Sequence, residues 1–403
     1  VELADGVKGT TPLKRFIVFG EKQISQARAY ESLLSEQSKS EPETKPVPNL
    51  DTPHIIMYTA GTTGKPKGAI LSQGASFWNV VNLNVALDFT SNDRNLLVLP
   101  MFHIGGIGLF TLPMLYDGGT VIIQRTFDPV KTLALLEQER ITLFFSVPAI
   151  FLALIQHPQF DARAFKNVRL VMSGGAPLPV SLVKQYHEAG IVLQQGFGMS
   201  EAAPSIATLA KELALKKAGS IGRALMHLEA CVVDDNMRVV PTGGVGELVI
   251  RGPNLMQGYW NRPEATEEAF AGGWFHTGDL ARMDEDGYYF LVDRARDMYI
   301  TGGENVYPAE VERILRQHPD VKDIAVVGIP DERWGEVGHA FVIAKENATV
   351  YAEDILSYCR GQMAKFKCPR SVTFCEDFPR TSLGKVRKSE LIRTYLKNES
   401  NAK

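Results

Sequence analysis

The chain has little of what marks secreted, membrane-spanning or nucleic-acid-binding proteins. It contains 4 cysteines in 403 residues, Cys231, Cys359, Cys368 and Cys375, and none forms a Cys-x-x-Cys pair. This spacing suits reduced thiols in a cytoplasmic protein better than a disulfide framework or a zinc site. No apolar run reaches the about 18 residues that a transmembrane helix needs. The net charge of −3 is not the basic excess that nucleic-acid-binding proteins carry. The composition leaves the oligomeric state and a possible peripheral membrane contact open.

The composition is that of a globular enzyme, with 45% hydrophobic and 22% charged residues, and the length favours two or more domains. The chain starts at Val1 without an initiator methionine, and the run Lys14–Phe19 predicts a strand that no earlier segment could pair with. We therefore expect the sequence to be part of a longer protein. Residues 31–50 are polar and rich in Ser, Glu, Pro and Lys, which predicts a linker or loop.

Between residues 54 and 195, short apolar runs alternate with longer amphipathic segments. The apolar runs predict strands at Leu96–Leu99, Thr120–Ile123, Thr142–Val147 and Leu170–Met172. The amphipathic segments predict helices over 75–87, 104–116, 129–139, 148–156 and 179–189. Because strands alternate with helices, this part of the chain predicts an α/β fold with a mostly parallel, doubly wound sheet.

The remaining chain predicts two further regions. Strand-like runs at Glu229–Val233, Gly246–Ile250 and Tyr288–Val292 are separated by turn residues and predict an antiparallel, β-barrel-like subdomain. Beyond it we expect helices at Pro308–Gln317, Ala352–Lys365 and Ser389–Leu396, and strands at Ile324–Ile329, Ala340–Ala344 and Val372–Phe374. The sequence thus predicts a large domain over 1–295 and a small α+β domain over 296–403.

The segment Tyr58–Gly68 (YTAGTTGKPKG) carries the strongest functional signal. Its glycines let backbone N–H groups turn toward an anion, and its Thr hydroxyls and Lys ammonium groups add donors. The segment is no Walker A loop, because Pro66 follows Lys65 and disfavours the helix that such a loop opens. We interpret it as a loop that closes over a polyphosphate; the alternative is a plain surface loop.

Further motifs point the same way but are weak singly. Gln195–Glu201 places glycines beside Phe197, which leaves room for a flat ring, and Glu201 offers a carboxylate of the kind that holds Mg²⁺. The alternative is a turn with a solvated Glu. Asp279, after Gly278, could accept two hydrogen bonds from a ribose diol. Pro379–Arg387 is a Gly-containing loop rich in cations, or else an exposed basic turn.

In this order, the motifs resemble those of the adenylate-forming enzymes, in particular the acyl-CoA synthetases, the group of fatty acyl-CoA ligases, 4-coumarate-CoA ligase and firefly luciferase. The resemblance runs from about residue 54 to 396 and includes Pro100–His103, Ser173–Leu178, Tyr259–Glu264 and Asp331–Glu336. It implies a large N-terminal domain, with a further segment before residue 1, and a small mobile C-terminal domain. It also implies two half-reactions: ATP and a carboxylate give an acyl-adenylate and pyrophosphate, and CoA then displaces AMP.

The resemblance implies a role for each matching residue. Thr59, Thr62, Thr63 and Lys67 would hold the β- and γ-phosphates of ATP. Ser200, where the family usually has Thr, would contact the α-phosphate, and Glu201 would hold Mg²⁺. Gly175, Ala176 and Phe197 would flank the adenine, and Asp279 and Arg294 would bind the ribose.

The C-terminal residues follow the same template. Lys385 would bridge the carboxylate and the α-phosphate during adenylation, and Arg296 sits at the family's hinge. After the hinge turns, the face with Gly302, Gly303 and Glu304 would line the pantetheine channel. Trp334 and Lys365–Lys367 are further candidates for contacts with CoA.

The resemblance also implies where the acyl pocket lies. His103 would border it as a gate, although a capping or core histidine is an equal alternative. Gly105, Gly106 and Gly108 would leave an open wall for a long, narrow acyl group, and Val171, Met172 and Ala203 would complete the lining. The pattern most resembles medium- and long-chain fatty acyl-CoA ligases. An aryl-CoA ligase of the benzoate or 4-coumarate type, an enzyme that loads an acyl carrier protein, and a non-catalytic nucleotide-binding protein remain as alternatives.

Overall fold

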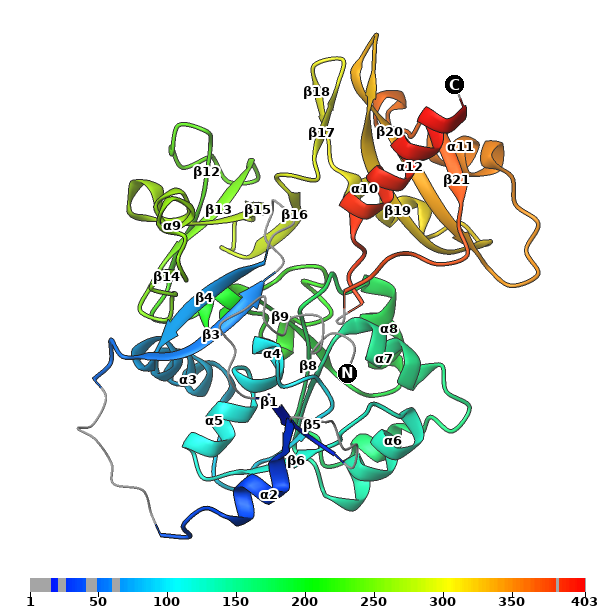
Figure 1. Ribbon diagram of the computed structural model, residues 1–403. Helices are drawn as coiled ribbons and strands as arrows, with labels where there is room; N and C mark the ends of the chain where they lie inside the picture. The colour runs from blue at the N-terminus through cyan, green and yellow to red at the C-terminus, as the bar shows by residue number, and fades with distance from the viewer. Residues whose placement is uncertain (1–15, 21–26, 41–48, 60–65, 382–383, 403) are drawn as a thin grey trace. The chain divides into compact units, whose positions relative to one another are not determined.

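The computed structural model describes residues 16–20, 27–40, 49–59, 66–381 and 384–402 (Figure 1). The chain divides into two compact units, residues 1–48 and 49–403. In the first unit, β1 (Phe16–Val18) pairs in parallel with β2 (Ala27–Ala29), and helix α2 (Tyr30–Ser35) follows. The strand expected at Lys14–Phe19 is thus present over its described part. The loop predicted from residue 31 is wrong up to Ser35, because the polar average of the window hides the short apolar segment Leu33–Leu34 in α2.

The second unit is built around a seven-stranded sheet of order β11-β10-β9-β8-β7-β5-β6. Its strands are β5 (Arg94–Leu97), β6 (Thr120–Ile123), β7 (Leu143–Ser146), β8 (Leu170–Ser173), β9 (Leu193–Gly198), β10 (Ser205–Thr208) and β11 (Arg223–Ala224). The strands from β6 to β9 are parallel, and β10 and β11 add an antiparallel edge. Since β7 and β8 are buried along their whole length, they read as continuous apolar runs rather than as alternating patterns.

Helices cover both faces of this sheet (Figure 1). They are α3 (Gln73–Leu87), α4 (Ile104–Ile107), α5 (Thr111–Tyr116), α6 (Pro129–Gln138), α7 (Pro148–Ile155) and α8 (Val180–Glu188). Phe144 packs on the side of α6, α7 and α8, whereas its neighbours Leu143 and Phe145 pack on the side of α3 and α5. This alternation of side chains along one strand confirms the doubly wound fold.

Local signals explain where these helices begin. The Ser72 side chain accepts a hydrogen bond from the Ala75 N–H at the start of α3, and Asp128 does the same for Lys131 in α6, as helix-capping residues commonly do. The single helix expected over 104–116 is wrong: α4 ends at Ile107 and α5 begins at Thr111. The glycines of this segment disfavour a continuous helix by about 1 kcal/mol each.

Two antiparallel sheets complete the large N-terminal domain. The first, of order β14-β4-β3, contains β3 (Pro53–Thr59), β4 (Lys67–Ser72) and β14 (Gly258–Tyr259). The second is the antiparallel subdomain expected from the sequence, with β12 (Glu229–Val233), β13 (Val245–Arg251), β15 (Phe275–Met283) and β16 (Tyr289–Arg294), and helix α9 (Pro263–Ala269) lies nearby in sequence. Leu71, Ile206 and Ile250 belong to one buried cluster that ties these sheets to the edge of the seven-stranded sheet.

From Pro308 onward, the smaller C-terminal domain has the α+β order that the sequence predicts, whereas the two strands that precede Pro308 were not predicted. Its elements are β17 (Tyr299–Thr301), β18 (Glu304–Val306), α10 (Pro308–Leu315), β19 (Val321–Asp331), β20 (Gly335–Ala344), α11 (Ala352–Arg360), β21 (Ser371–Phe374) and α12 (Lys388–Ala402). Short 3₁₀ turns complete the chain: η1 (Ala162–Phe165), η2 (Ser200–Ala202), η3 (Lys211–Leu213), η4 (Ala271–Gly273) and η5 (Lys365–Lys367). The domain boundary after residue 295 stays a prediction.

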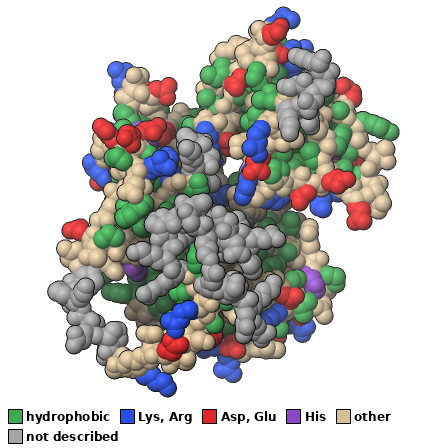
Figure 2. Space-filling view, viewed as in Figure 1, with side chains coloured by type: hydrophobic (Ala, Val, Ile, Leu, Met, Phe, Trp, Pro, Cys, Tyr) green, Lys and Arg blue, Asp and Glu red, His purple; other side chains and the backbone are tan. Residues whose placement is uncertain are grey.

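Charged side chains of both signs lie on the surface of the molecule. Lys and Arg side chains lie interspersed with Asp and Glu over the face that Figure 2 shows, with no extended region of one sign. Within the described ranges, no helix has the length and apolar content to cross a membrane.

Candidate active site

The predicted phosphate loop connects the two strands of a hairpin. β3 and β4 pair antiparallel with Thr59 opposite Lys67, and the Thr59 hydroxyl donates to the Lys67 carbonyl oxygen at 3.5 Å. Thr62 and Thr63 lie outside the described residues. The hairpin therefore holds Thr59 and Lys67 opposite each other where the loop begins and ends.

A tyrosine joins this loop to the predicted metal ligand. Glu201 stands in η2, directly after β9, and is only 6% exposed. The Tyr259 hydroxyl donates to Glu201 Oε1 at 3.0 Å, and Lys67 Nζ lies 5.0 Å from the centroid of the Tyr259 ring, within cation–π range. Burial, and after it the Glu201 carboxylate, raise the pKa of Tyr259 well above its usual range. The motif Tyr259–Glu264 indicated the family, but its sequence does not predict the contact between Tyr259 and Glu201.

The predicted adenine residues lie at the carboxyl ends of two adjacent strands. β8 and β9 are parallel neighbours, so Gly175 and Ala176 after β8 come to the same edge of the sheet as Phe197 in β9. A Cβ atom on Gly174 would lie 2.8 Å from the Gly196 carbonyl oxygen. Glycine at this position is therefore what lets the two strand ends approach closely. Ligands of open α/β sheets bind at such carboxyl ends.

The predicted ribose residues form a buried ion pair. Asp279 in β15 is opposite Arg294 in β16, and Arg294 Nε lies 2.6 Å from Asp279 Oδ1. Asp279 is 4% exposed, and burial raises the pKa of its carboxyl group, against the opposing effect of Arg294. Among the described residues, the buried Asp279 Oδ2 has no hydrogen-bond partner. Because an unpaired buried acceptor costs free energy, this oxygen is suited to a ligand hydroxyl.

Lys385 belongs to the same group of side chains. The side chain is accessible to solvent, yet the protein around it lowers the pKa of its ammonium group through desolvation, and Arg294 and Arg296 act in the same direction. Asp279 and Glu201 oppose these effects. The long-range charges that act on Lys385 thus come from the predicted ribose, hinge and metal residues.

His103 lies close to this lysine. It occupies the position before α4 but makes no capping hydrogen bond with its side chain, so the capping alternative is not what the structure has. Desolvation lowers the pKa of His103, and the positive charge of Lys385 lowers it further. Both effects favour the neutral form of the His103 ring over its charged form.

The predicted CoA residues gather on the C-terminal domain. Gly302 and Gly303 form the turn between β17 and β18, with φ angles of +59° and +89° that favour glycine. The Gly302 N–H donates to the Trp334 carbonyl oxygen at 2.9 Å, and a Cβ on Gly302 would lie 2.7 Å from the Trp334 ring. Lys367 in η5 pairs with Glu310 at 2.8 Å, while Lys365 stays exposed.

The expectation of an open glycine wall for the acyl group is mostly wrong. A Cβ on Gly106 would lie 2.3 Å from the Pro100 carbonyl oxygen, and one on Gly108 would lie 3.0 Å from the Ile104 carbonyl oxygen and from Pro204. These two glycines serve close packing of the chain. Gly105 alone fits the expectation, since its nearest neighbour is the Phe145 ring at 3.9 Å.

The three residues that were expected to complete the lining of the acyl pocket do not lie together. Val171 and Met172 point to opposite faces of the sheet and belong to different buried clusters, because adjacent residues of a strand alternate. They therefore cannot both line one pocket. Ala203 is buried in a third cluster.

The two glycines offer a matched test of this difference. Gly106→Ala is expected to lower the free energy of unfolding by about 1–3 kcal/mol, as overpacked positions do, because its Cβ would meet backbone that cannot move aside. Gly105→Ala has room and should change stability by no more than about 1 kcal/mol, the gain in helix propensity. Urea unfolding of both variants measures the effect, and equal stabilities would contradict this account of the packing.

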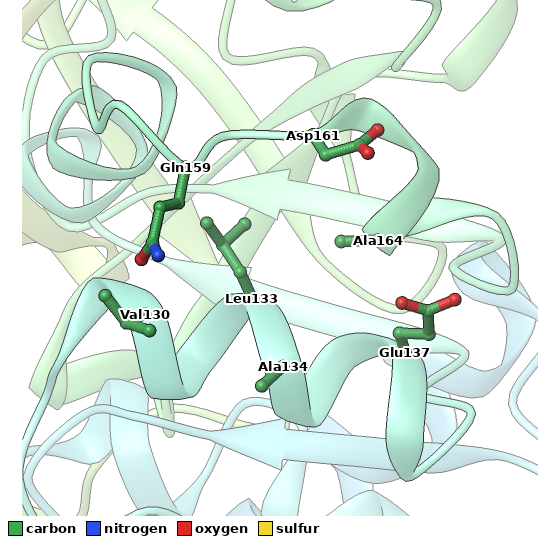
Figure 3. A pocket seen from close by; sticks show the side chains of 7 residues that line it. All are labelled: Val130, Leu133, Ala134, Glu137, Gln159, Asp161 and Ala164. Atoms are coloured by element: carbon green, nitrogen blue, oxygen red, sulfur yellow. The ribbon is translucent and has the colours of Figure 1, made fainter.

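A pocket of about 220 Å³ lies on another part of the large domain, between α6 and η1 (Figure 3). It is lined by Val130, Leu133, Ala134, Glu137, Gln159, Asp161 and Ala164. Its carboxylates are engaged in ion pairs, Glu137 with Lys166 and Asp161 with Arg163. None of the predicted site residues lines it.

Comparison with known proteins decides the family. Residues 6–260 match the family model of the AMP-binding enzyme, and residues 310–385 match that of the AMP-binding enzyme C-terminal domain. The chain belongs to the AMP-binding enzyme family. It is an adenylate-forming acyl-CoA ligase, as its curated relatives are named CoA ligases and synthases.

Three similar proteins illustrate the range of this family. A feruloyl-CoA synthase of Amycolatopsis sp is 43% identical over 355 residues, which are 88% of this chain and 72% of the relative. The long-chain-fatty-acid–CoA ligase FadD13 of Mycobacterium tuberculosis is 40% identical over 341 residues, 85% of this chain and 67% of the relative. The structure of O-succinylbenzoate coenzyme A synthetase (MenE) from Bacillus subtilis with ATP and a magnesium ion superposes with a TM-score of 0.83 at 31% identity, covering 93% of this chain and 79% of that one.

The residues of this AMP-binding enzyme fit ATP and Mg²⁺. The unpaired Asp279 Oδ2 is an acceptor for a nucleotide hydroxyl. Across the described part of the chain, no group of three or more His, Cys, Asp or Glu side chains could hold a metal by itself. Mg²⁺ is usually bound through one or two carboxylates and substrate phosphates, and the buried Glu201 offers one such carboxylate.

Proposed function

We propose that this acyl-CoA ligase activates an aromatic carboxylic acid with ATP and transfers the acyl group to CoA. The observation that carries the aromatic preference is the 43% identity to a feruloyl-CoA synthase. The packing around Gly106 and Gly108 supports this preference. Other atoms of the chain fill the space beside these two glycines, so only Gly105 could leave room for a long acyl group. A medium- or long-chain fatty acid is the second candidate, because the identity to FadD13 is 40%.

For the nucleotide, we propose the roles that the resemblance to the adenylate-forming enzymes implies. Thr59, Thr62, Thr63 and Lys67 bind the β- and γ-phosphates. Ser200 contacts the α-phosphate, and Glu201 holds Mg²⁺. Held by Glu201, Mg²⁺ would supply positive charge against the phosphates of ATP. Gly175, Ala176 and Phe197 flank the adenine. Asp279, oriented by Arg294, accepts from the ribose hydroxyls through its free oxygen.

For the acyl and thiol groups, the proposed roles divide between the domains. Lys385 neutralises the carboxylate and the α-phosphate as they meet, and His103 borders the acyl group. Gly302, Gly303 and Trp334 contact CoA, and Arg296 is the hinge residue between domains 1–295 and 296–403. The protein is proposed to act in the cytoplasm.

The choice of acid and acceptor is tested with the purified protein. ATP–pyrophosphate exchange is measured with ferulate, benzoate, octanoate and dodecanoate, and product formation is measured with free CoA and with an acyl carrier protein. We expect the highest kcat/KM with an aromatic acid and CoA as the acceptor. A stepwise rise of kcat/KM with chain length would favour the fatty acid. Transfer to the carrier protein alone would show a carrier-loading enzyme.

Tyr259 provides a test of the metal assignment. Tyr259→Phe removes the hydroxyl that donates to Glu201 but keeps the ring under Lys67. Because a hydrogen bond to a charged group contributes about 1.5–3 kcal/mol, the Mg²⁺ concentration for half-maximal exchange should rise roughly tenfold or more. Tyr259→Leu removes the ring as well and should also raise the KM for ATP.

Tyr288 gives the matched control for this series. Its ring likewise lies 5.0 Å from a lysine ammonium group, that of Lys217, and it is not one of the proposed site residues. Tyr288→Phe should leave the Mg²⁺ dependence unchanged. An unchanged Mg²⁺ dependence in Tyr259→Phe would show that the hydroxyl does not orient the ligand.

A further inference from the structure

The loop that carries Lys385 is described over residues 379–381 and 384–387, where Arg380 and Val386 pair antiparallel. The Arg387 N–H donates to the Pro379 carbonyl oxygen at 2.8 Å, and the Thr381 N–H donates to the Lys385 carbonyl oxygen at 2.8 Å. Gly384 turns the chain with a φ angle of +79°. These contacts give the loop its shape, but they do not fix where the loop lies on the C-terminal domain.

The side of the loop before Lys385 is attached to β19. Arg380 Nη2 lies 2.6 Å from Asp323 Oδ2, and Arg380 Nη1 donates to the Gly384 carbonyl oxygen at 3.0 Å. One guanidinium group thus joins an aspartate of the sheet to the peptide group that directly precedes Lys385.

The side after Lys385 is attached to α10. Lys388 Nζ lies 2.7 Å from Glu312 Oε1, and the same oxygen accepts a hydrogen bond from the Val326 N–H at 2.9 Å. Glu312 is only 7% exposed. A carboxylate that is so well buried remains charged at low free-energy cost only while its cationic and N–H partners are in place.

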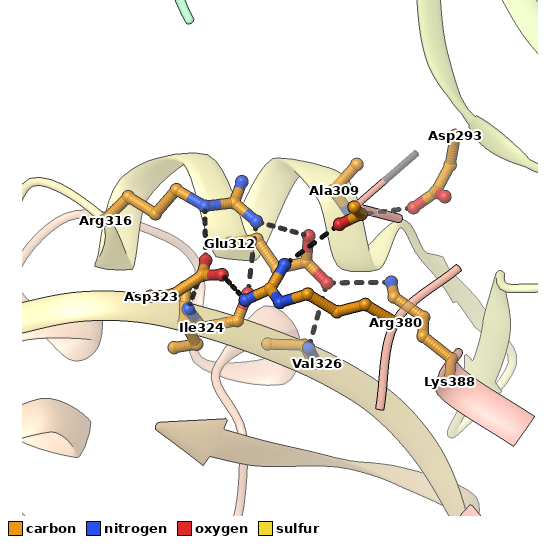
Figure 4. A network of polar contacts seen from close by, with 10 residues as sticks. Asp293, Ala309, Glu312, Arg316, Asp323, Ile324, Val326, Arg380 and Lys388 are labelled. Carbon is orange, nitrogen blue, oxygen red and sulfur yellow. Dashed lines mark hydrogen bonds and ion pairs between the residues drawn. The ribbon is translucent and has the colours of Figure 1, made fainter. Parts of the chain in front are cut away.

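A third cation joins the two attachments. Arg316 Nη2 lies 3.3 Å from Glu312 Oε2, and Arg316 Nε lies 3.4 Å from Asp323 Oδ1. Figure 4 shows the continuous network that results, from Lys388 through Glu312 and Arg316 to Asp323 and Arg380. Both sides of the loop are therefore anchored to α10 and β19, which pack against each other.

We propose that the ion pairs Asp323–Arg380 and Glu312–Lys388, here called the two loop anchors, position Lys385 for acyl-adenylate formation. The proposal rests on the role of Lys385 proposed above. A lysine has a long flexible side chain, so its backbone must be held if the ammonium group is to meet two reacting anions. A misplacement of about 1 Å can reduce a rate by roughly 10²-fold. The anchor residues act through Lys385 and are positioning residues.

The test uses one variant at each anchor of the whole chain, Asp323→Asn and Lys388→Met. Adenylation is measured by ATP–pyrophosphate exchange, and thioester formation is measured from a supplied acyl-adenylate and CoA. We expect adenylation to fall by roughly 10- to 100-fold in each variant, with thioester formation within about twofold of wild type. Lys388→Arg keeps the cation and should retain most of the adenylation rate.

Two controls separate positioning from a general loss of structure. Glu353→Gln removes another ion pair of the same domain, the exposed pair with Arg360 in α11, and should leave both half-reactions and the thermal midpoint unchanged. In a Lys385→Ala background, Lys388→Met should cause no further loss of adenylation, because an anchor that acts through Lys385 has nothing left to position.

The outcomes distinguish this inference from the proposed function. If Lys385→Ala itself retains adenylation, the assigned role of Lys385 fails. If Lys385→Ala loses adenylation while both anchor variants keep it, the loop anchors are overturned. Equal loss of both half-reactions with a lowered thermal midpoint, or additive effects in the Lys385→Ala background, would likewise overturn them.

Discussion

Lys385→Ala is expected to reduce acyl-adenylate formation by roughly 10²–10³-fold while sparing thioester formation from a supplied acyl-adenylate. Adenylation brings a carboxylate against the α-phosphate of ATP, and a cation between two anions lowers the barrier directly. Removing one such group from a preorganised site typically costs 10²–10³-fold in rate, about 3–4 kcal/mol. Thioester formation has no need of this cation, since the adenylate is already made.

The measurement and its control are direct. ATP–pyrophosphate exchange reports adenylation, and CoA thioester formation from the synthetic adenylate reports the second half-reaction. Lys322→Ala, an exposed lysine of β19 in the same domain, should behave as wild type. Equal loss of both half-reactions in Lys385→Ala would contradict a role of Lys385 in adenylation alone.

The electrostatic surroundings of Lys385 add an expectation on pH. Desolvation and the neighbouring arginines lower the pKa of its ammonium group below the ordinary 10.5. The charge is present below the lowered pKa and is lost as the pH rises through it. The adenylation rate of the wild type should therefore fall on the alkaline side at a pH below the usual lysine range.

Glu201→Gln is expected to reduce Mg²⁺-dependent adenylation by roughly 10²-fold or more. The substitution keeps the size of the side chain and removes its charge from a site that is only 6% exposed. Tyr259 can still donate to the amide oxygen, so the loss would come from the missing negative charge. Titration of exchange activity with MgCl₂ measures both the maximal rate and the Mg²⁺ requirement.

The control for this second experiment is Glu212→Gln in the exposed turn η3, which should leave the Mg²⁺ titration unchanged. A near-normal rate of Glu201→Gln at ordinary Mg²⁺ would show that another group holds the metal. The Tyr259 variants would then have no metal ligand to act on.

The regular elements could be predicted because their signals are local. The strand expected at Thr120–Ile123 is β6 with the same bounds, and the helix expected over 129–139 is α6, since hydrophobic period and capping residues lie within one window of sequence. The helix expected over 104–116 is interrupted after Ile107, because the glycines of this segment disfavour a continuous helix. In the structure, Gly106 is needed where the chain folds back on Pro100.

What the sequence by itself determined is the family and the order of its motifs, because phosphate, metal and nucleotide binding each need particular residue types at close spacing. Only the tertiary structure decided which residues support them. Tyr259 meets Glu201 across 58 positions of sequence, and Lys388 meets Glu312 across the C-terminal domain. Such contacts depend on strand order and on the packing of helices against sheets, and no local pattern of residues encodes them. The glycines differ for the same reason. The missing side chain leaves space at Gly105, whereas other atoms of the chain occupy that space at Gly106 and Gly108.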